Sequence, residues 1–417
     1  MQPSTQDLTD PIVVVGGGQA AATACATLRA NGFDGELIVI SNEATPPYQR
    51  PPLSKAYLKG ELSADRLLIK PPAWYEKQQI ELRLNQAVTA IDRIGKEITT
   101  TNGPVKYSRL ILATGSRPRT LPLPGSDAMG VFEMRSIADV NGLSPHLTAG
   151  SRLVVIGAGY IGLEAAASAR MLGVEVTVLE YAPRVLARVT GAKISEFFQS
   201  LHAAQGVTIT TDARIEKITT DGGKVTGVAL ADGTIITADV VLMGVGIEPN
   251  AELAEQAGIV CRNGIAVDRD ARTSDPNIYA AGDCASRELI HYRREGRLES
   301  VHNAVEQGKL AAAHILGLPR PVEDAPWFWS DQFHVKLQIA GLSAGFDQQV
   351  IRGDPTSESF TLFYLKDGQL LAADAINASP EFVFSRKIIS NNGKVTADQL
   401  ADVDTPMKNI AAAALQR

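Results

Sequence analysis

Cysteine is scarce in this sequence, with only three cysteines among 417 residues. Cys25, Cys261 and Cys284 lie far apart, and none of them forms a C-x-x-C pair. This spacing argues against a zinc site and against a disulfide framework. Long apolar runs are also missing, since none approaches the roughly 18 residues that a membrane-spanning helix needs. We therefore expect no metal site and no membrane association.

Positive charge is in the minority. Lysine and arginine number 40 against 46 aspartates and glutamates, which gives a net charge of -6 and a pI near 5.6. A chain-wide nucleic-acid-binding surface is therefore not expected, although a local basic patch is compatible with this charge. The opening residues MQPSTQDLTD lack the arginines, the basic segment and the apolar segment of a targeting signal, so we expect a cytoplasmic location.

The most informative stretch runs from Arg152 to Glu180. It contains a short apolar run, the turn GAGYIG, an alanine-rich helical run, and a second apolar run that ends in an acid. A lone G-x-G-x-x-G is weak support, but within a strand–turn–helix–strand unit that ends in an acid it predicts a dinucleotide site. The glycines let the backbone approach a pyrophosphate, whose charge the helix N-terminus favours.

A second unit of this kind lies near the start of the chain. The apolar run from Ile12 to Val15 leads into GGGQAA, where Ala21 takes the third glycine position, which requires only a small side chain. Another apolar run at 37–40 precedes Ser41-Asn42-Glu43, and Glu43 stands where a ribose-binding acid is expected. Two such units predict two bound nucleotides.

The length of the chain predicts two or three domains, because 417 residues exceed a single core. Proline-rich segments near residues 118–125, 249 and 319–321 fit linkers. Beyond the last of them, alternating apolar runs at 333–339, 348–352, 359–365 and 370–376 predict a small α+β domain.

Seven motifs occur in a fixed order: GGGQAA, RPPLSK, ATG, VVIGAGYIGLEAAA, TSDPNIYAAGDCA, ESVHNAVEQ and APWFWSDQF. Together they resemble the FAD-dependent ferredoxin reductases that serve bacterial cytochrome P450s and Rieske-type ring-hydroxylating dioxygenases. The resemblance implies an α/β, glutathione-reductase-like fold with two Rossmann-type domains. It places a split FAD domain at 8–118 and 247–325, an inserted NAD domain at 119–246, and a C-terminal α+β domain at 326–417 that covers the flavin.

The implied activity is electron transfer from NADH, through FAD, to a [2Fe–2S] ferredoxin that feeds a P450 monooxygenase or a ring-hydroxylating dioxygenase. In this family FAD is held by a glycine-rich turn, by an acid at its ribose, and by scattered contacts along the chain. By position these contacts fall on Gly16, Gly18, Ala20, Glu43 or Asn42, Arg50, Lys55, Val88, Thr114, Arg135, Asp283, Val301 and Trp329. His302 departs from the proline or glutamine expected there, and its role stays open between tuning the flavin and contacting solvent.

The resemblance also implies the contacts of NADH. The pyrophosphate would be lined by Gly157, Gly159, Tyr160, Ile161 and Gly162. The carboxylate of Glu180 would bind a free 2′-hydroxyl and repel a 2′-phosphate, which favours NADH over NADPH, although Arg184 nearby softens that preference. Glu164 is either a solvated helix charge or the partner of Lys55 beside the flavin. We favour the pair and assign both residues a catalytic role.

Cysteine usage separates this chain from relatives with a thiol relay. NADH peroxidases and coenzyme A-disulfide reductases carry a cysteine in the segment matching RPPLSK, where this chain has Lys55. A rubredoxin or monodehydroascorbate-type reductase, or a redox-regulated flavoprotein resembling apoptosis-inducing factor, stays an alternative. An acidic ferredoxin would dock on basic side chains, for which the candidates are Lys309, Lys408, Arg66, Arg386 and Lys387. The chain is expected to be a monomer or a homodimer.

Overall fold

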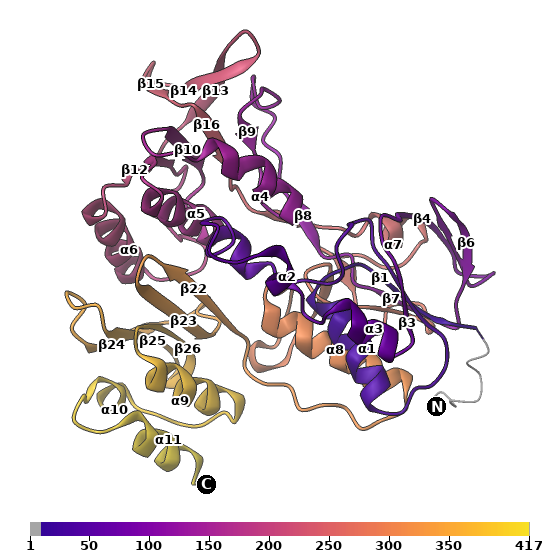
Figure 1. Cartoon of the computed structure of the whole chain (residues 1–417). Coiled ribbons are helices and arrows are strands. Elements are labelled where there is room, and N and C mark those ends of the chain that lie inside the picture. Colours follow the sequence, from indigo (N-terminus) through magenta and orange to yellow (C-terminus); the bar gives the residue numbers. More distant parts are fainter. Residues whose placement is uncertain (1–9, 417) are drawn as a thin grey trace. The chain divides into compact units, whose positions relative to one another are not determined.

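The computed structural model describes residues 10–416. The start of the predicted FAD domain at residue 8 and most of the segment used to predict location lie outside these residues. The described chain forms two compact units, each assembled from three segments. Unit 1 comprises the chain up to residue 49 together with 65–117 and 248–323, and unit 2 comprises 50–64, 118–247 and the chain from 324 onward (Figure 1).

Unit 1 is organised around a five-stranded parallel sheet with the order β19-β7-β1-β2-β3. Its strands are β1 (Ile12–Val15), β2 (Leu37–Ile40), β3 (Ile80–Arg83), β7 (Arg109–Leu112) and β19 (Ile278–Ala280). Three of them, β1, β2 and β7, are buried at every position, as expected of short apolar strands covered on both faces. The strand order reverses at β1, between β2 and β7, and ligands of open α/β sheets bind at such a point.

Two helices, α1 (Gln19–Ala30) and α8 (Val301–Ile315), pack closely side by side in unit 1 (Figure 1). Small residues permit this approach, since a Cβ at Gly308 would lie 2.8 Å from the carbonyl oxygen of Ala20. Ala20, Ala24 and Leu310 belong to the core that the two helices share with the sheet.

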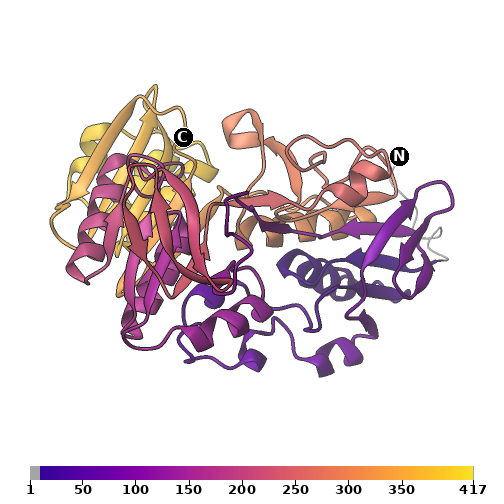
Figure 2. The same cartoon turned by 90° about the horizontal axis from the view of Figure 1, so that it is seen from above.

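The remaining elements of unit 1 are short. An antiparallel sheet, in purple at the right of Figure 2, is made of β4 (Val88–Asp92), β5 (Glu97–Thr100) and β6 (Gly103–Lys106). A second small sheet contains β18 (Ile265–Ala266), β20 (Ala285–Leu289) and β21 (Arg294–Gly296). The helices are α3 (Pro72–Lys77), α7 (Glu252–Gln256) and the 3-10 turn η4 (Ile290–Tyr292), while α2 (Ala64–Leu67), β8 (Ser116–Pro118) and β17 (Ile247–Pro249) span the unit boundaries.

Unit 2 contains a second five-stranded parallel sheet, with the order β12-β11-β10-β16-β9. Its strands are β9 (Val131–Phe132), β10 (Arg152–Ile156), β11 (Glu175–Leu179), β12 (Thr208–Thr210) and β16 (Val240–Met243). Its helices are α4 (Ile137–Leu143), α5 (Tyr160–Met171) and α6 (Ala192–Ala204), with 3-10 turns η2 (Pro51–Ser54) and η3 (Ser144–His146). A meander of β13 (Ile215–Asp221), β14 (Lys224–Leu230) and β15 (Ile235–Thr237) completes this part.

The C-terminal part of unit 2 is an antiparallel sheet with the order β22-β23-β26-β25-β24. Its strands are β22 (Trp327–Gln332), β23 (Val335–Gly341), β24 (Gln348–Gly353), β25 (Phe360–Lys366) and β26 (Gln369–Ile376). The helices α9 (Ser379–Ser390), α10 (Ala397–Ala401) and α11 (Met407–Leu415) follow, and residues of α9 and α11 share a buried cluster with the sheet.

Two predicted strand boundaries are wrong. The sequence placed a strand at 333–339, but Phe333 has a positive φ of 56° and lies in the tight turn between β22 and β23, so the tryptophan-rich segment is itself the first strand. The segment 207–219, whose residues also predict a strand, is two strands in different sheets, separated by a loop in which Asp212 has a φ of 54°. In both places a non-glycine residue in the left-handed region ends the strand, which apolar periodicity does not reveal.

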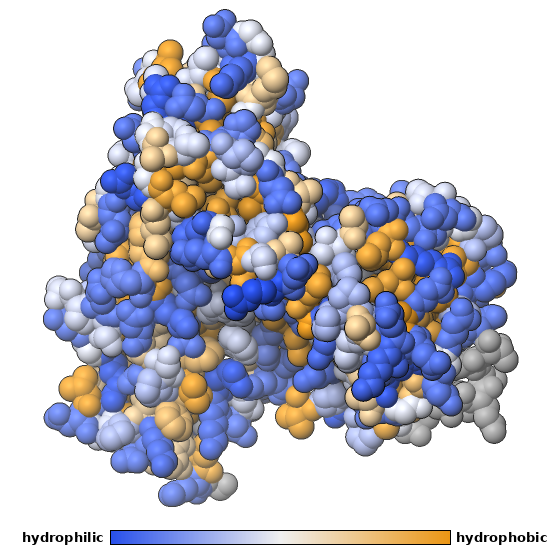
Figure 3. All heavy atoms as spheres, in the orientation of Figure 1, coloured by the Kyte–Doolittle hydropathy of each residue, from blue (hydrophilic) through white to orange (hydrophobic). Residues whose placement is uncertain are grey.

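No helix among residues 10–416 is long and apolar enough to cross a bilayer. On the face drawn in Figure 3, hydrophilic residues predominate between smaller hydrophobic areas.

Candidate cofactor sites

The turn after β1 forms a glycine cradle in unit 1. Gly16 has a φ of 126°, and a Cβ at this position would lie 2.1 Å from the carbonyl oxygen of Ala113, so only glycine fits. Gly18 is the N-cap of α1, has no side-chain cap, and would place a Cβ in open space. The first turn of α1 also carries no acid. An uncapped helix N-terminus above an open cradle fits the pyrophosphate of FAD.

Four loops follow the carboxyl ends of parallel strands in unit 1 and therefore meet at one edge of the sheet. They carry Gly16, Glu43, Thr114 and Asp283. The carboxylate of Glu43 accepts a 2.6 Å hydrogen bond from the hydroxyl of Tyr48, and that of Asp283 accepts a 2.9 Å bond from Ser116. The Thr114 hydroxyl donates to the carbonyl of Asn250 at 2.7 Å. Both acids are thus held by hydroxyl donors at the edge where the cradle opens.

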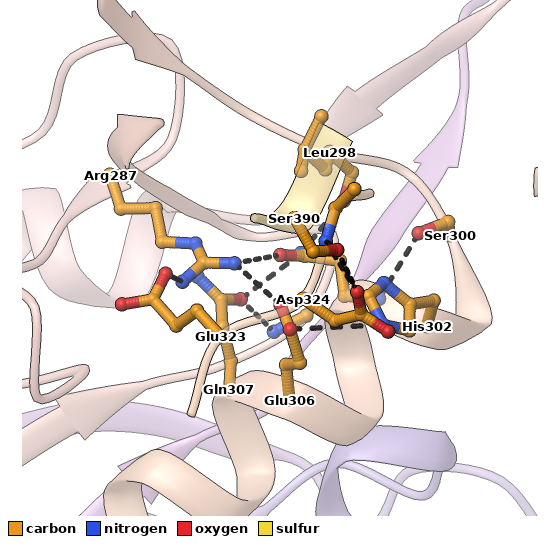
Figure 4. A network of polar contacts seen from close by, with 12 residues as sticks. Arg287, Leu298, Ser300, His302, Glu306, Gln307, Glu323, Asp324 and Ser390 are labelled. Carbon is orange, nitrogen blue, oxygen red and sulfur yellow. Dashed lines mark hydrogen bonds and ion pairs between the residues drawn. The ribbon is translucent and has the colours of Figure 1, made fainter. Parts of the chain in front are cut away.

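Helix α8 begins at this same edge and is held by buried polar contacts (Figure 4). The Ser300 hydroxyl caps the helix by accepting from the backbone N–H of Asn303 at 3.1 Å. Within the helix, Gln307 accepts a 2.7 Å bond from the N–H of Gly282, which fixes the loop after β19. The first helical residue is Val301, and His302 follows, with its Nε2 3.7 Å from the carboxylate of Glu306.

A buried arginine underlies this helix start. Arg287, with 7% of its side chain exposed, forms ion pairs with Glu306 at 2.9 Å and with Glu323 at 2.6 Å. It also donates to the side-chain oxygen of Asn303 at 3.3 Å. One cation satisfying two carboxylates and an amide orders the first two turns of α8, whose N-terminal dipole end favours negative charge nearby.

The turn after β10 repeats the cradle in unit 2. Gly157 has a φ of 103°, and a Cβ there would lie 2.5 Å from the carbonyl oxygen of Gly244. A Cβ at Gly162 would lie 2.1 Å from the carbonyl oxygen of Gly157, so helix α5 approaches the turn too closely for any other residue. Gly159 is the N-cap of α5, again without a side-chain cap and facing open space. This geometry fits the pyrophosphate of a second dinucleotide.

Glu180 follows β11 directly and lies against this cradle. Its two carboxylate oxygens accept hydrogen bonds from the backbone N–H groups of Ala158, at 2.6 Å, and Ala182, at 2.8 Å. Each oxygen keeps a lone pair for a ribose hydroxyl. Arg184 donates to the carbonyls of Thr190 and Ala187 and to the hydroxyl of Ser195, all within 2.9 Å. Its guanidinium is therefore engaged by residues 187–195.

The structure brings Lys55 and Glu164 together in unit 2, with 2.5 Å between the ammonium and a carboxylate oxygen. Glu164 lies in α5 and is only 2% exposed, so it is not a solvated helix charge. Its carboxylate also accepts from the hydroxyls of Ser54 at 2.6 Å and Ser330 at 2.7 Å. The sequence reasoning missed both serines, although they stand inside the quoted motifs RPPLSK and APWFWSDQF.

The other predicted contacts are divided between the units. In unit 1, Ala20 is buried in the first turn of α1, Asn42 lies in the loop after β2, and Val88 begins β4. In unit 2, Arg50 donates to the backbone carbonyl of Arg135 at 2.7 Å.

Three aromatic or apolar predictions also fall in unit 2. The ring of Tyr160 stacks on Phe328 with 4.5 Å between centroids, while Ile161 beside it is 45% exposed. Trp329 packs in β22 with its ring centroid 5.5 Å from that of Trp327. These placements leave their predicted roles as predictions.

None of the three cysteines has the character of a reactive thiol. Burial raises the pKa of Cys25 to about 12 and that of Cys261 to about 11. Burial also raises the pKa of Cys284, whose thiol donates to the carbonyls of Leu112 and Ala281. All three are free cysteines, and residues 10–416 contain no cluster of side chains that could hold a metal ion. Burial therefore favours the neutral thiol at all three cysteines over the thiolate that a relay uses.

Two family models match the chain. One, described as pyridine nucleotide-disulphide oxidoreductase, matches residues 10–308, and the other, described as reductase C-terminal, matches residues 327–411. Among curated proteins, the 5,5'-dehydrodivanillate O-demethylase ferredoxin reductase subunit of Sphingobium sp. is 43% identical over 404 residues, which cover 96% of this chain and 98% of that protein. Putidaredoxin reductase of Pseudomonas putida is 42% identical over 412 residues, covering 97% of each chain.

Solved structures agree with these matches. The covalent putidaredoxin reductase–putidaredoxin complex aligns with a TM-score of 0.96 at 40% identity, covering 98% of this chain and all of that one. A ferredoxin reductase from Rhodopseudomonas palustris aligns with a TM-score of 0.94 at 41% identity, covering 97% of this chain and all of that one. The predicted α/β fold of the nucleotide-disulphide oxidoreductase type, with a C-terminal domain, is confirmed.

Proposed function

The chain belongs to the putidaredoxin reductase-like ferredoxin reductases of the pyridine nucleotide-disulphide oxidoreductase family, and we propose that it carries electrons from NADH, through FAD, to a [2Fe–2S] ferredoxin. The observation that carries the proposal is the pair of open glycine cradles, each at an uncapped helix N-terminus, in a chain whose cysteines are all unsuited to relay electrons. The ferredoxin would in turn feed a P450 or a ring-hydroxylating dioxygenase.

FAD, when bound, accepts two electrons together and releases them singly, which a nicotinamide does not readily do. The chain's own residues supply binding, orientation and charge. Gly16 and Gly18 would hold the FAD pyrophosphate, with Glu43 at the adenosine ribose. In unit 2, Gly157 and Gly159 would do the same for NADH.

Selection between nicotinamide cofactors is assigned to Glu180. Its carboxylate would bind the free 2′-hydroxyl of NADH and repel the 2′-phosphate of NADPH. The engagement of Arg184 by the loop at 187–195 supports this preference, because a guanidinium held there is not directed at a 2′-phosphate. The predicted catalytic roles of Lys55 and Glu164 at the flavin belong to the same proposal, as do the predicted domain boundaries.

For ferredoxin docking, the best supported candidate is Lys309, exposed on α8. It lines an open groove of about 750 Å³ in unit 1 together with Lys70 and apolar residues of α1 and the segment after α8. Two cations beside apolar surface suit an acidic protein partner, since charge steers the encounter and apolar area holds it.

The other docking candidates differ in how free their charges are. Lys408, Arg66 and Lys387 are exposed. Arg386 is engaged by Asp324 at 2.8 Å and by the ring of Trp327, so it is the weakest candidate. We propose a monomer or a homodimer in the cytoplasm, as expected from the sequence.

The reductase proposal is tested by steady-state NADH oxidation with a panel of [2Fe–2S] ferredoxins, a rubredoxin and monodehydroascorbate as acceptors. We expect turnover with at least one ferredoxin and much slower turnover with the other acceptors. Negligible reduction of every ferredoxin would overturn the proposal, and faster rubredoxin or monodehydroascorbate reduction would favour those alternatives. A response of complex formation to flavin reduction, without turnover, would favour the regulatory flavoprotein.

Docking at Lys309 is tested by Lys309→Glu, with Lys217→Glu on the exposed face of β13 as the matched charge reversal. The first variant should raise the ferredoxin KM and leave ferricyanide reduction unchanged, and the second should change neither. Added salt should raise the ferredoxin KM of the parent more than that of Lys309→Glu, because the variant lacks the charge that salt screens in the parent. An equal loss with both acceptors would contradict docking at this residue.

A further inference from the structure

The carboxylate of Glu164 is the end point of a buried hydrogen-bond chain that extends away from Lys55. Ser330 in β22 contacts its second oxygen at 2.7 Å, and Gln332 contacts the Ser330 hydroxyl at 3.2 Å. The side-chain oxygen of Gln332 then meets Nε2 of His202 in α6 at 2.8 Å. All four residues are at most 2% exposed, so no solvent competes for these bonds.

The chemistry of each group fixes the direction of the chain. An ionised carboxylate only accepts, so the single O–H of Ser330 points at Glu164 and its oxygen must accept from the NH₂ of Gln332. The amide oxygen of Gln332 then accepts a hydrogen bond from Nε2–H of His202. The opposite amide orientation would make Ser330 donate to Gln332 and would remove a donor from Glu164. Every hydrogen bond therefore points toward the carboxylate.

His202 fits the terminal donor role. Burial lowers its pKa, which favours the neutral ring with one N–H. That hydrogen is on Nε2, since Nδ1 is buried and has no hydrogen-bond partner among the described residues. The ring is further fixed by an edge contact with Phe333, with 5.0 Å between centroids.

This hydrogen-bond chain acts on Glu164 electrostatically and does not conduct protons. An amide does not pass a proton at ordinary pH, so Gln332 interrupts any relay between His202 and Glu164. Aligned hydrogen bonds polarise one another, and here they all favour negative charge on Glu164. A buried carboxylate is otherwise costly, and a carboxylate paired only with Lys55 would leave one oxygen without a donor.

We propose that Ser330, backed by Gln332 and His202, is a positioning residue that holds the Glu164 carboxylate, and through it the Lys55 ammonium, in one place. The inference rests on the proposed function, in which Lys55 acts at the flavin. It adds to that function three side chains from β22 and α6 that touch neither cofactor in the proposed roles.

The first test is a double-mutant cycle on urea unfolding of the holoprotein, with Ser330→Ala and Glu164→Gln made singly and together. Coupling should change the unfolding equilibrium constant by about tenfold or more, as for a hydrogen bond to a charged group. Ser385→Ala is the matched control, because Ser385 is equally buried in the same unit but its hydroxyl has no hydrogen-bond partner within residues 10–416. The effect of Ser385→Ala on the free energy of unfolding should simply add to that of Glu164→Gln. Additivity of Ser330→Ala with Glu164→Gln would overturn the inference.

The second test is the midpoint potential of the bound FAD. When Glu164 loses a donor, its own negative charge is less compensated, which disfavours the more negative reduced flavin. Ser330→Ala should shift the potential downward by about 30 mV, a tenfold change for a two-electron couple. Gln332→Met should shift it less in the same direction, and Ser385→Ala should not shift it. Unchanged potentials, or a larger shift in Gln332→Met than in Ser330→Ala, would contradict an oriented chain.

The two tests separate this inference from the proposed function. If the parent protein reduces no ferredoxin but the unfolding cycle shows coupling, the positioning role stands and the proposed acceptor is wrong. If the parent reduces ferredoxin and neither test responds, the positioning role is wrong and the reductase proposal stands.

Discussion

In both parallel sheets the central strand, β1 or β10, is followed by a glycine with positive φ, and a Cβ at that position would collide with the loop after a neighbouring strand. Gly16 faces the carbonyl of Ala113, and Gly157 faces that of Gly244. Both glycines precede an uncapped 12-residue helix. The two cradles therefore share one backbone design, which fits a shared ligand group, a pyrophosphate.

The difference between the two cradles lies in their helices. The third small residue is the buried Ala21 in α1, whereas Gly162 in α5 has no room for a Cβ. Two residues further on, α1 has Thr23, which lines an open groove, and α5 has Glu164, which is buried with Lys55. The shared backbone fits pyrophosphate binding, and the distinct side chains of α5 add a buried ion pair to that helix.

The largest expected effect separates the two cradles. Gly16→Ala should yield protein depleted of FAD, because strained backbone alone costs about 1–3 kcal/mol and the Cβ would also clash with Ala113. Gly157→Ala should retain FAD and lose NADH-dependent flavin reduction. Flavin absorbance per protein and anaerobic reduction by NADH measure the two outcomes.

Gly159→Ala serves as the control for folding, since its Cβ meets nothing within 4 Å. Its melting temperature should match the parent while its KM for NADH rises. Loss of FAD in Gly157→Ala would show that the cradles are not independent. Unimpaired flavin reduction by NADH in that variant would contradict the assignment of the second cradle to NADH.

The next effect concerns the acids of the two cradles. Glu180→Ala should raise the KM for NADH by about 10–100-fold, the range for losing a hydrogen bond to a charged group, and should narrow the preference over NADPH. Glu43→Ala should leave both KM values unchanged and weaken FAD retention. An unchanged ratio of kcat/KM for NADH and NADPH in Glu180→Ala would remove Glu180 from cofactor selection.

A third prediction concerns the helix α6 that carries His202. The N–H of its N-cap Gly191 donates to the hydroxyl of Tyr364, which donates to the buried Asp374 at 2.5 Å. Burial raises the pKa of Asp374 from 3.8 to about 7. The folded protein thus holds this proton more tightly than the unfolded chain, so the associated stability is present below about pH 4 and is lost as pH rises to about 7.

Asp374→Asn should therefore exceed the parent's stability to urea by less at pH 5 than at pH 8, relative to the exposed control Asp404→Asn. Flavin reduction by NADH should follow the same order near the midpoint of unfolding. If the parent instead became more stable relative to Asp374→Asn between pH 5 and pH 8, the upward shift of the Asp374 pKa would be contradicted.

The smallest expected effect is that of Tyr48→Phe, which removes the 2.6 Å hydrogen bond to Glu43 and keeps the ring. One such bond is worth about 1 kcal/mol, so FAD should dissociate about fivefold more readily, with NADH affinity unchanged. Fluorescence of released FAD measures it. An effect as large as that of Gly16→Ala would mean that the ribose acid, not the glycine turn, dominates FAD binding.

The sequence predicted the cradles well, because a strand, a glycine turn and a helix are contiguous and their geometry is local. It also predicted the pairing of Lys55 with Glu164, but only through a family resemblance, since the residues are 109 positions apart. The sequence did not predict the hydrogen bonds of Ser330 and His202. Their bonds span 166 and 130 residues, and a single serine or histidine carries no local periodicity that marks its partner.

The most direct measurement of the central claim is an anaerobic titration of the FAD-loaded protein with NADH and excess [2Fe–2S] ferredoxin, following both chromophores. The account predicts that two ferredoxins are reduced for each NADH oxidised, with NADPH a much poorer donor. Flavin that is reduced by NADH but transfers no electrons to any [2Fe–2S] ferredoxin would contradict it.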